Sequence, residues 1–469
     1  MHKAGGEVAE SYGEFLARKA PAAANRGLGA APALSGCLSL HQRVCAGFAL
    51  NAGASGCYLD TGLGKTLVEH ELVAHGAEAT NGLGLILAPL AVAGQIVSEG
   101  AKFGYQARVI RDQGEARPGT NVCNYDRLDK LDPRAFGAVA LDEASILKNF
   151  TGATTRKLIR GFAGTRFRLA ATATPAPNDH MELGQQAEFL GVMPSNEMLM
   201  RWFISDQTQM GRYRLKHHAV MSFWDWMASW ARMGERPSDL GGEDAGFDLP
   251  ELRVHRHRTG AYAKPIGDGL FGTEQLSATD MHRVKRQTAS ARAAMAAALA
   301  GSDRESWVIW VDTDYEADAV LAALPEAVEV RGSHPVEWKE RRIAQFLDGS
   351  ARVLLTKPSI CGWGLNLQHC ARTAFVGRSF SYEAWYQAIR RFWRYGQERP
   401  VDAHIIVAEG EDAIGRVIDR KAADHAAMKA AMREAMRRAL GREAALKVAY
   451  DPQHIGGMPE WLSMASTSV

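Results

Sequence analysis

One short segment constrains the fold of this 469-residue chain more than any other. The segment L-D-T-G-L-G-K-T, at Leu59–Thr66, joins a short apolar stretch to a helical pattern. Gly62 and Gly64 allow the backbone to curl so that its N–H groups point at phosphate oxygens. Lys65 can then reach the β- and γ-phosphates, and the Thr66 hydroxyl can ligate Mg²⁺. The segment therefore predicts a phosphate-binding loop between a strand and a helix.

A second segment, L-D-E-A-S at Leu141–Ser145, complements the first. An apolar strand ends where Asp142 can approach the same metal ion, and Glu143 follows it in the chain. A carboxylate in the position of Glu143 can polarise an attacking water molecule. The two segments stand in this order about eighty residues apart. Together they predict a hydrolase that uses ATP and Mg²⁺.

Composition places the chain among ordinary globular proteins, with 46% apolar and 23% charged residues. Its longest apolar stretches are strand-sized, and residues 1–30 lack the apolar core of a secretory signal. We therefore expect a cytoplasmic protein with no membrane partner. The net charge of +2 leaves any nucleic-acid binding to local basic patches. The six cysteines form no C-x-x-C pair, which favours free buried thiols.

Two parts of the chain alternate short apolar strands with helical patterns, which predicts two parallel sheets covered by helices. Strands of the first sheet are expected at Cys57–Asp60, Leu83–Ala88, Val109–Arg111, Val139–Asp142 and Phe167–Ala171. Strands of the second are expected at Trp307–Val311, Val328–Arg331, Val353–Thr356, Thr373–Val376 and Ala403–Val407. Only the first part contains a phosphate loop. We therefore expect the nucleotide to lie between two lobes.

The stretch between these parts has a different character. It contains four tryptophans in a helical pattern, which favour the core of a helical insertion over a base-stacking surface: Trp202, Trp224, Trp226 and Trp230. The basic run Arg253–Arg258 fits either a phosphate contact or a solvated loop. A second basic group, Arg283, Lys285, Arg286 and Arg292, has no nearby acid in the sequence and is placed near DNA as a weak hypothesis. The final helix is expected to pack its Ala and Met side on the second lobe.

Further segments stand in an order typical of one protein family. The first half of the chain contains L-H-Q-R at Leu40–Arg43, D-E-A-S-I-L-K-N at Asp142–Asn149 and R-L-A-A-T-A-T-P-A-P-N at Arg168–Asn178. The second half contains L-L-T-K-P-S-I-C-G-W-G-L-N-L at Leu354–Leu367 and Q-A-I-R-R-F-W-R-Y-G-Q at Gln387–Gln397. From about Leu38 to Val407 the chain resembles superfamily-two helicases, which are DEAD/DEAH-box-like. Within them it resembles Swi/Snf-type DNA translocases, including compact versions encoded by bacteriophages.

The resemblance implies an α/β fold with two RecA-like parallel-sheet domains of the P-loop NTPase type and a helical insertion between them. The expected parts are an N-terminal leader at 1–34, lobe 1 at 35–195, the insertion and linker at 196–300, lobe 2 at 301–440 and a tail at 441–469. For a phage-encoded protein the compartment would be the host cytoplasm.

The resemblance also implies roles for individual residues. The catalytic residues would be Lys65, Glu143, Arg391 and Arg394, with Thr66 and Asp142 holding Mg²⁺. Nucleotide contacts would come from Gln42, Thr61, Gly62, Leu63, Gly64, Lys65, Thr66, Gly364, Asn366 and Gln387. Ser145, Thr172 and Thr174 would couple hydrolysis to movement. Pro89, Leu90, Asn124, Thr356 and Lys357 would contact the nucleic-acid backbone.

The two arginines can also be argued from their chemistry. Arg391 and Arg394 lie three residues apart on an expected helix and so share a face. A planar, permanently charged guanidinium can clamp phosphate oxygens in a bidentate manner, whereas the alternative is a solvated basic face. In the family pattern, Asp is common where this chain has Arg390 and His where it has Ser145. These departures put the role of Ser145 in question and make Arg390 easy to mistake for a finger.

The favoured function is an ATP-dependent DNA translocase or helicase, acting as a monomer on duplex or single-stranded DNA mainly through backbone contacts. Two alternatives stay open. One is an RNA-dependent ATPase of the DEAD/DEAH type, and the other is a non-hydrolysing scaffold that binds nucleic acid.

Overall fold

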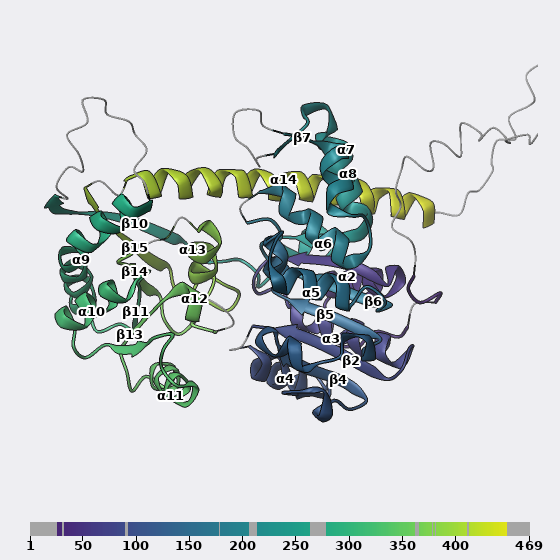
Figure 1. The fold of residues 1–469 in the computed structure, drawn as a ribbon, viewed down its shortest axis with the longest axis horizontal. Helices are drawn as coiled ribbons and strands as arrows, with labels where there is room; N and C mark the ends of the chain where they lie inside the picture. The colour runs from purple at the N-terminus through teal and green to yellow at the C-terminus, as the bar shows by residue number, and fades with distance from the viewer. Residues whose placement is uncertain are drawn as a thin grey trace, which may run out of the picture.

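The computed structural model describes residues 26–30, 32–89, 92–177, 179–205, 213–262, 278–361, 365–377, 379, 381–409 and 412–447. Two lobes, each built on a parallel sheet, lie side by side, and a long C-terminal helix crosses both (Figure 1). The predicted α/β class with two parallel-sheet domains is confirmed. Most of the expected leader and most of the expected tail lie outside the described residues.

The first lobe contains a seven-stranded sheet of order β3-β4-β2-β5-β6-β1-β9, in which every pair is parallel. Its strands are β1 (Ala54–Leu59), β2 (Leu83–Ala88), β3 (Ala107–Val109), β4 (Gly119–Asn124), β5 (Ala138–Asp142), β6 (Phe167–Ala171) and β9 (Ala231–Gly234). Its helices include α2 (Leu40–Ala52), α3 (Lys65–Glu78), α4 (Ala93–Lys102), α5 (Ala153–Gly161) and α6 (Leu183–Leu190). Strands β1, β5 and β6 are buried at every residue, as expected for central strands covered on both faces.

The tryptophan-rich stretch is an excursion from the first lobe that returns to it. Helix α7 (Ser195–Trp202), an antiparallel hairpin of β7 (Phe203–Ser205) and β8 (Tyr213–Leu215), and helix α8 (Val220–Trp230) lead into β9. Strand β9 pairs with β1, so the first sheet extends beyond the expected lobe boundary at 195. The four tryptophans are buried, which confirms their role as core. Trp226 packs against Trp202 and Trp230, and Trp224 packs against Phe223.

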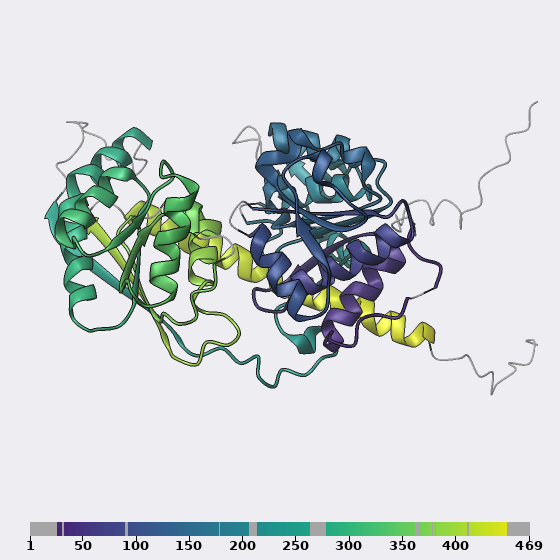
Figure 2. The same ribbon diagram turned by 90° about the horizontal axis from the view of Figure 1, so that it is seen from below.

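The second lobe contains a six-stranded parallel sheet of order β10-β15-β14-β11-β13-β12. Its strands are β10 (Leu252–Tyr262), β11 (Trp307–Trp310), β12 (Val328–Val330), β13 (Val353–Thr356), β14 (Arg372–Phe375) and β15 (Val401–Glu409). Its helices are α9 (Ala278–Gly301), α10 (Asp314–Ala323), α11 (Val336–Leu347), α12 (Pro358–Cys361) and α13 (Tyr382–Ile389). Figure 2 shows the connection from the first lobe, which runs from η7 (Pro237–Leu240) to β10.

Two expectations for the middle stretch are wrong, because its second part belongs to the second lobe. The basic run Arg253–Arg258 lies within β10, which pairs with β15, so it is a sheet edge and not a loop. Strand β10 and helix α9 therefore begin lobe 2 before residue 301, and the expected insertion at 196–300 is not one unit.

The weak DNA hypothesis for α9 fails for two of its cations, because they pair with acids distant in sequence. Lys285 Nζ lies 2.7 Å from Asp312 Oδ2. Arg292 Nη1 lies 2.8 Å from Glu316 Oε1, and both of these side chains are fully buried. These two cations therefore hold α9 against α10 and the loop before it.

The long helix α14 (Asp412–Lys447) crosses from the second lobe to the first (Figure 1). Its first half contacts β15 and α13, and its second half contacts α8, β9 and η7. Met428, Met432 and Met436 belong to the hydrophobic core of the first lobe. The expectation that this helix packs on the second lobe is therefore wrong for its second half. Helical spacing showed which face is apolar but not which lobe covers it.

The remaining sequence expectations concern thiols and membranes. All six cysteines are free, and five of them are buried, with Cys37 the exposed one. Within the described ranges, no helix combines the length and the apolar character needed to cross a bilayer.

Candidate nucleotide site

A cleft of about 500 Å³ between the lobes contains most of the predicted site. From the first lobe it is lined by the phosphate loop, by Gln42, and by Asp142 and Glu143. From the second lobe it is lined by Arg391 and Arg394. Groups separated by more than 300 residues therefore face one cavity, as the sequence predicted.

The phosphate loop has the predicted backbone. Gly62 and Gly64 have φ values of +92° and +75°, in the left-handed region that favours glycine. A Cβ at Gly64 would lie 2.1 Å from Gln42 Nε2, so the loop leaves no room for a side chain there. Helix α3 begins at Lys65, so its first N–H groups are available to an anion.

Lys65 is held by the loop itself. Its Nζ donates to Leu59 O at 3.0 Å and to Asp60 O at 3.4 Å. Backbone carbonyls carry only partial charge, so a phosphate group entering the cleft is a stronger partner for this ammonium group. The side chain is thus kept in the cleft, close to the loop.

Strand β5 delivers the two acids. Glu143 has φ +56°, and among the described residues it is the one non-glycine residue with positive φ. Such a conformation is costly and tends to occur at functional sites. Burial, with the Glu143 carboxylate next in importance, raises the pKa of Asp142 to about 7. A nearby cation is therefore what stabilises the charged form of Asp142 in this position.

The residues present fit a bound Mg²⁺. Mg²⁺ commonly binds one or two protein groups together with substrate phosphates, and not a full protein cage. The Thr66 hydroxyl and the Asp142 carboxylate line the same cleft beside the loop. Within the described part of the chain, no cluster of three or more His, Cys, Asp or Glu could hold a metal ion by itself.

The two arginines follow α13. Arg391 is buried, donating from Nε to Gln387 O at 3.2 Å and from Nη2 to Gln387 Oε1 at 2.8 Å. Burial lowers the pKa of Arg391 to about 10, and the Glu143 carboxylate acts in the opposite direction. The Nε of Arg394 is buried without a hydrogen-bond partner. A buried unpartnered donor on the wall of the cleft fits an anionic ligand.

A chain of hydrogen bonds joins Glu143 to the second lobe. The Thr172 hydroxyl donates to Glu143 Oε2 at 3.1 Å and accepts from the Thr174 N–H at 3.1 Å. Gln387 Nε2 then donates to Thr174 Oγ1 at 3.4 Å. Thr172 and Thr174 thus lie between Glu143 and the second lobe, and their coupling role stays a prediction. Ser145 is buried two residues after Glu143 and takes no part in this chain of bonds.

Several predicted nucleotide contacts lie elsewhere. Leu63, Asn366 and Gln387 do not line the cleft, and Gly364 lies outside the described residues. Gln387 orients Arg391, while the Asn366 amide bonds to Gln368. Gln42 lines the cleft, but its Oε1 accepts from Ser39 N at 2.9 Å and its Nε2 donates to Leu63 O at 3.2 Å. Gln42 therefore also caps α2 and supports the phosphate loop.

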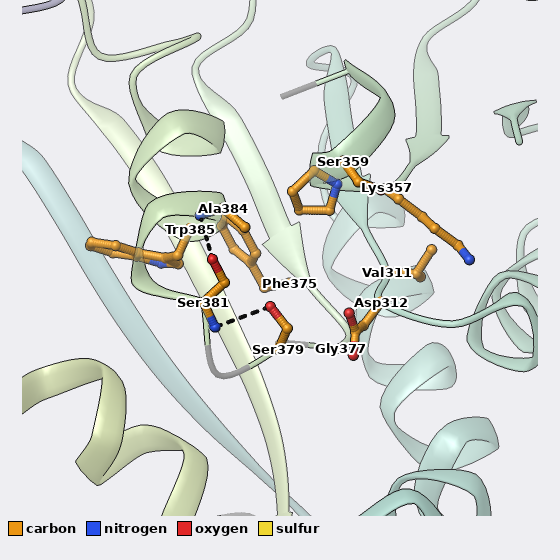
Figure 3. Close-up of a pocket in the computed structure, with 11 residues that line it drawn as sticks. Val311, Asp312, Lys357, Ser359, Phe375, Gly377, Ser379, Ser381, Ala384 and Trp385 are labelled. Carbon is orange, nitrogen blue, oxygen red and sulfur yellow. Dashed lines mark hydrogen bonds between the residues drawn. The ribbon is translucent and has the colours of Figure 1, made fainter. Parts of the chain in front are cut away.

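The predicted nucleic-acid contacts do not form one surface. The side chains of Asn124 and Thr356 are buried, and the Thr356 hydroxyl donates to Val330 O at 3.0 Å. The burial of these two side chains therefore argues against their contacting nucleic acid. Pro89 is half-buried, and Leu90 lies outside the described residues. Lys357 lies in a separate pocket of about 80 Å³ at the ends of β11, β13 and β14, with Ser379 and Ser381 (Figure 3).

Two aromatic residues that line the cleft were not predicted from the sequence. Phe247 comes from the connection between the lobes, and its ring stacks on Tyr395 with centroids 4.7 Å apart. Tyr395 stands within the Q-A-I-R-R-F-W-R-Y-G-Q segment, so its place after the arginines was the available signal. Phe247 sits in a Gly- and Asp-rich loop, where no periodic pattern marked it.

A buried acid beside the site was also missed. Glu69 lies four residues after Lys65 on α3, fully buried, and neither of its carboxylate oxygens has a hydrogen-bond partner. Burial and the nearby Asp142 carboxylate raise the pKa of Glu69 well above its usual range. Its spacing from Lys65 by one helical turn was a signal that the sequence offered.

Comparisons with known proteins give limited similarity. No protein-family model matches the chain. Protein p41 of Acyrthosiphon pisum secondary endosymbiont phage 1 is 25% identical over 346 residues, covering 63% of this chain and 72% of that protein. Among solved structures, the chain is similar to a Sulfolobus solfataricus SWI2/SNF2 ATPase core in complex with dsDNA. The TM-score is 0.40 at 14% identity, covering 87% of this chain and 96% of that one.

Proposed function

We propose that this protein is an ATP-dependent DNA translocase or helicase that hydrolyses ATP in the cleft between its lobes. One observation carries the proposal. The phosphate loop, the acids after β5 and the two arginines after α13 line a single cavity. Each of these groups is of the type that ATP hydrolysis requires, and they come from both lobes.

The residues divide the chemistry between them. The loop N–H groups and Lys65 bind and neutralise the phosphates, while Glu143 orients the attacking water. Thr172 holds one oxygen of Glu143, which leaves the other oxygen for that water. Arg391 and Arg394 stabilise the charge that develops on the transferred phosphoryl group. Thr66 and Asp142 would hold Mg²⁺, which would supply positive charge to neutralise the phosphates.

Movement would follow from the division of the site between two lobes. The arginines act only when the second lobe is seated against the first, so hydrolysis and release would change the interlobe contacts. The hydrogen-bond chain from Glu143 to Gln387 supports this coupling, because a change at the acid can reach the second lobe. Segments at the strand ends, including Lys357, would then shift along nucleic acid.

The preference for DNA rests on the motif resemblance. The K-N pair after D-E-A-S, the G-L-N-L segment and the Y-G-Q segment favour a Swi/Snf-type translocase over an RNA-dependent DEAD/DEAH ATPase. Binding through the phosphate backbone would be sensitive to salt and weakly selective for sequence.

The test is the ATPase rate of the full chain with duplex DNA, single-stranded DNA or RNA, together with triplex-displacement and unwinding assays. We expect duplex or single-stranded DNA to stimulate phosphate release more than RNA does. Stimulation by RNA alone would support the DEAD/DEAH alternative. Nucleotide binding without phosphate release would support the non-hydrolysing scaffold. A rate indifferent to every nucleic acid would rule out a translocase.

A further inference from the structure

A second junction between the lobes lies beside the phosphate loop and is built from charge. Asp60, the residue directly before Thr61 of the loop, is buried and faces two cations. Its Oδ1 lies 3.1 Å from Arg390 Nη2, and its Oδ2 lies 3.1 Å from Lys429 Nζ. Arg390 belongs to the second lobe and Lys429 to α14, so one carboxylate joins three parts of the molecule.

Further hydrogen bonds tie this cluster together. The Tyr386 hydroxyl donates to Asp60 Oδ1 at 2.7 Å and accepts from Lys429 Nζ at 3.0 Å. Arg390 Nη2 also donates to Thr61 O at 3.1 Å, within the loop itself. On α14, Lys429 reaches Glu235 Oε1 at 3.3 Å. The Arg390 and Lys429 cations hold the pKa of Asp60 well below its usual range, although burial acts in the opposite direction.

The position of Arg390 connects this cluster to the arginines of the cleft. Arg390 directly precedes Arg391, and Tyr386 lies one helical turn earlier on α13. Both are tied to the residue that opens the phosphate loop. Arg390 does not line the cleft, so it is not a third finger. The contacts instead fix the end of α13 in register with the loop.

Helix α14 packs against both partners of this junction. Ile418 packs with Tyr382 and Tyr386 of α13, while Met428 and Met432 lie in the core of the first lobe. Packing against both lobes therefore fixes the position of α14, and with it the position of Lys429 relative to Asp60. A buried ion pair is weak evidence for stability, and its best-attested role is to fix the register between the parts that it joins.

We propose that Asp60, Tyr386, Arg390 and Lys429 form a positioning device that holds Arg391 and Arg394 against the phosphate loop, with α14 as its brace. The inference rests on the proposed hydrolysis in the cleft. The four residues touch no phosphate themselves. They set the distance and angle at which the arginines face the loop, and they hold the lobes together without nucleotide.

The experiment compares substitutions of one lysine with a matched control on the same helix. Lys429→Gln removes the cation, Lys429→Arg keeps it, and Arg437→Gln removes an exposed cation that pairs with Glu434. We expect Lys429→Gln to lower kcat by about 10²-fold, the cost of small misplacements in active sites, while the affinity for a fluorescent nucleotide changes little. Lys429→Arg should recover most of kcat, and Arg437→Gln should match wild type.

A second variant tests whether the partners act as one unit. Asp60→Asn should lower kcat in the same way, and the double variant with Lys429→Gln should be no slower than the slower single variant. Additive losses would overturn the inference, because they would mean that the two residues act independently. Thermal unfolding of each variant identifies any that fail to fold.

A distance measurement separates this inference from the proposed function. Spin labels at the exposed positions Lys130→Cys in lobe 1 and Glu340→Cys in lobe 2, in a Cys37→Ser background, report the lobe separation without nucleotide. We expect a broader and longer distance distribution in Lys429→Gln than in Arg437→Gln. If wild type lacks ATPase activity but the distances change, the proposed function fails and the positioning device stands. Identical distances and identical kcat in the two variants would overturn the device.

Discussion

The two lobes share one layout but supply opposite kinds of groups to the cleft. In the first lobe, the glycine-containing loop follows β1, and Asp142 and Glu143 stand at the end of β5. Both groups thus lie at the carboxyl ends of parallel strands. The same edge of the second sheet contains a pocket of about 80 Å³ lined by Lys357 and three serines (Figure 3). The second lobe reaches the nucleotide cleft through arginines that follow a helix.

This difference shows how one architecture can serve two roles. The first lobe supplies the groups proposed to bind phosphate and orient water, but Lys65 is its one cation among the described residues that line the cleft. Of its described residues, the second lobe adds two guanidinium groups to the lining of the cleft and no acid. Under the proposed function neither lobe would complete the site alone, so the rate of hydrolysis would measure how the lobes are arranged.

The first prediction removes the contribution of the first lobe. Lys65→Ala and Glu143→Gln should each abolish phosphate release, because no other described group of the cleft could replace the phosphate-binding cation or the water-orienting acid. Steady-state phosphate release measures the loss, and thermal unfolding should show an intact fold. Lys102→Ala, at the exposed end of α4, is the control. Turnover near wild type in either variant would contradict the site assignment.

The second prediction removes the contribution of the second lobe. Arg391→Ala and Arg394→Ala should each lower turnover by about 10³- to 10⁵-fold, the range found for arginine fingers, with a smaller loss of nucleotide affinity. Single-turnover hydrolysis and a fluorescent-nucleotide titration separate the two effects. Arg304→Ala, an exposed arginine before β11, provides the control. A proportionate loss of binding would mean that these residues hold the substrate and do not promote its reaction.

The sequence predicted the parts of the site that depend on local patterns. The phosphate loop, Asp142, Glu143 and the two arginines needed only short motifs, and the structure places all of them in one cleft. Central strands such as β5 were also predictable, because continuous apolar runs mark strands buried on both faces.

Contacts between residues that are far apart in the chain could not be predicted from the sequence. Strand β9, A-R-M-G, contains a buried arginine and joins the first sheet only after the excursion through α8. Strand β10 is a basic edge strand, and its run of basic residues fits a solvated loop as well as a strand. Lys429 and Asp60 are 369 residues apart, so no spacing rule connects them. Each of these features depends on a tertiary contact, which local propensity does not encode.

The third prediction tests the neutral link between the lobes. Thr174→Val removes the hydroxyl that accepts from Gln387 Nε2, while the Thr174 N–H that donates to Thr172 stays in place. A single neutral hydrogen bond contributes about 1 kcal/mol, so we expect turnover to fall roughly fivefold. Stimulation by nucleic acid should fall with it if this bond transmits lobe movement. Thr155→Val, at a buried threonine of α5 away from the cleft, is the control, and equal effects of the two would reduce Thr174 to a packing role.

The smallest predicted effect concerns the edge of the second sheet where the two lobes differ. Lys357 follows β13 and pairs with Asp314 at 2.8 Å, whereas Arg304 precedes β11 and so lies at the opposite edge of the sheet. If Lys357 contacts one phosphate, Lys357→Ala should reduce the slope of log affinity against log salt by about 1, uniformly across sequences. Arg304→Ala should leave the slope unchanged. An equal change in both variants would mean that the second lobe attracts DNA through its overall charge and not through its strand ends.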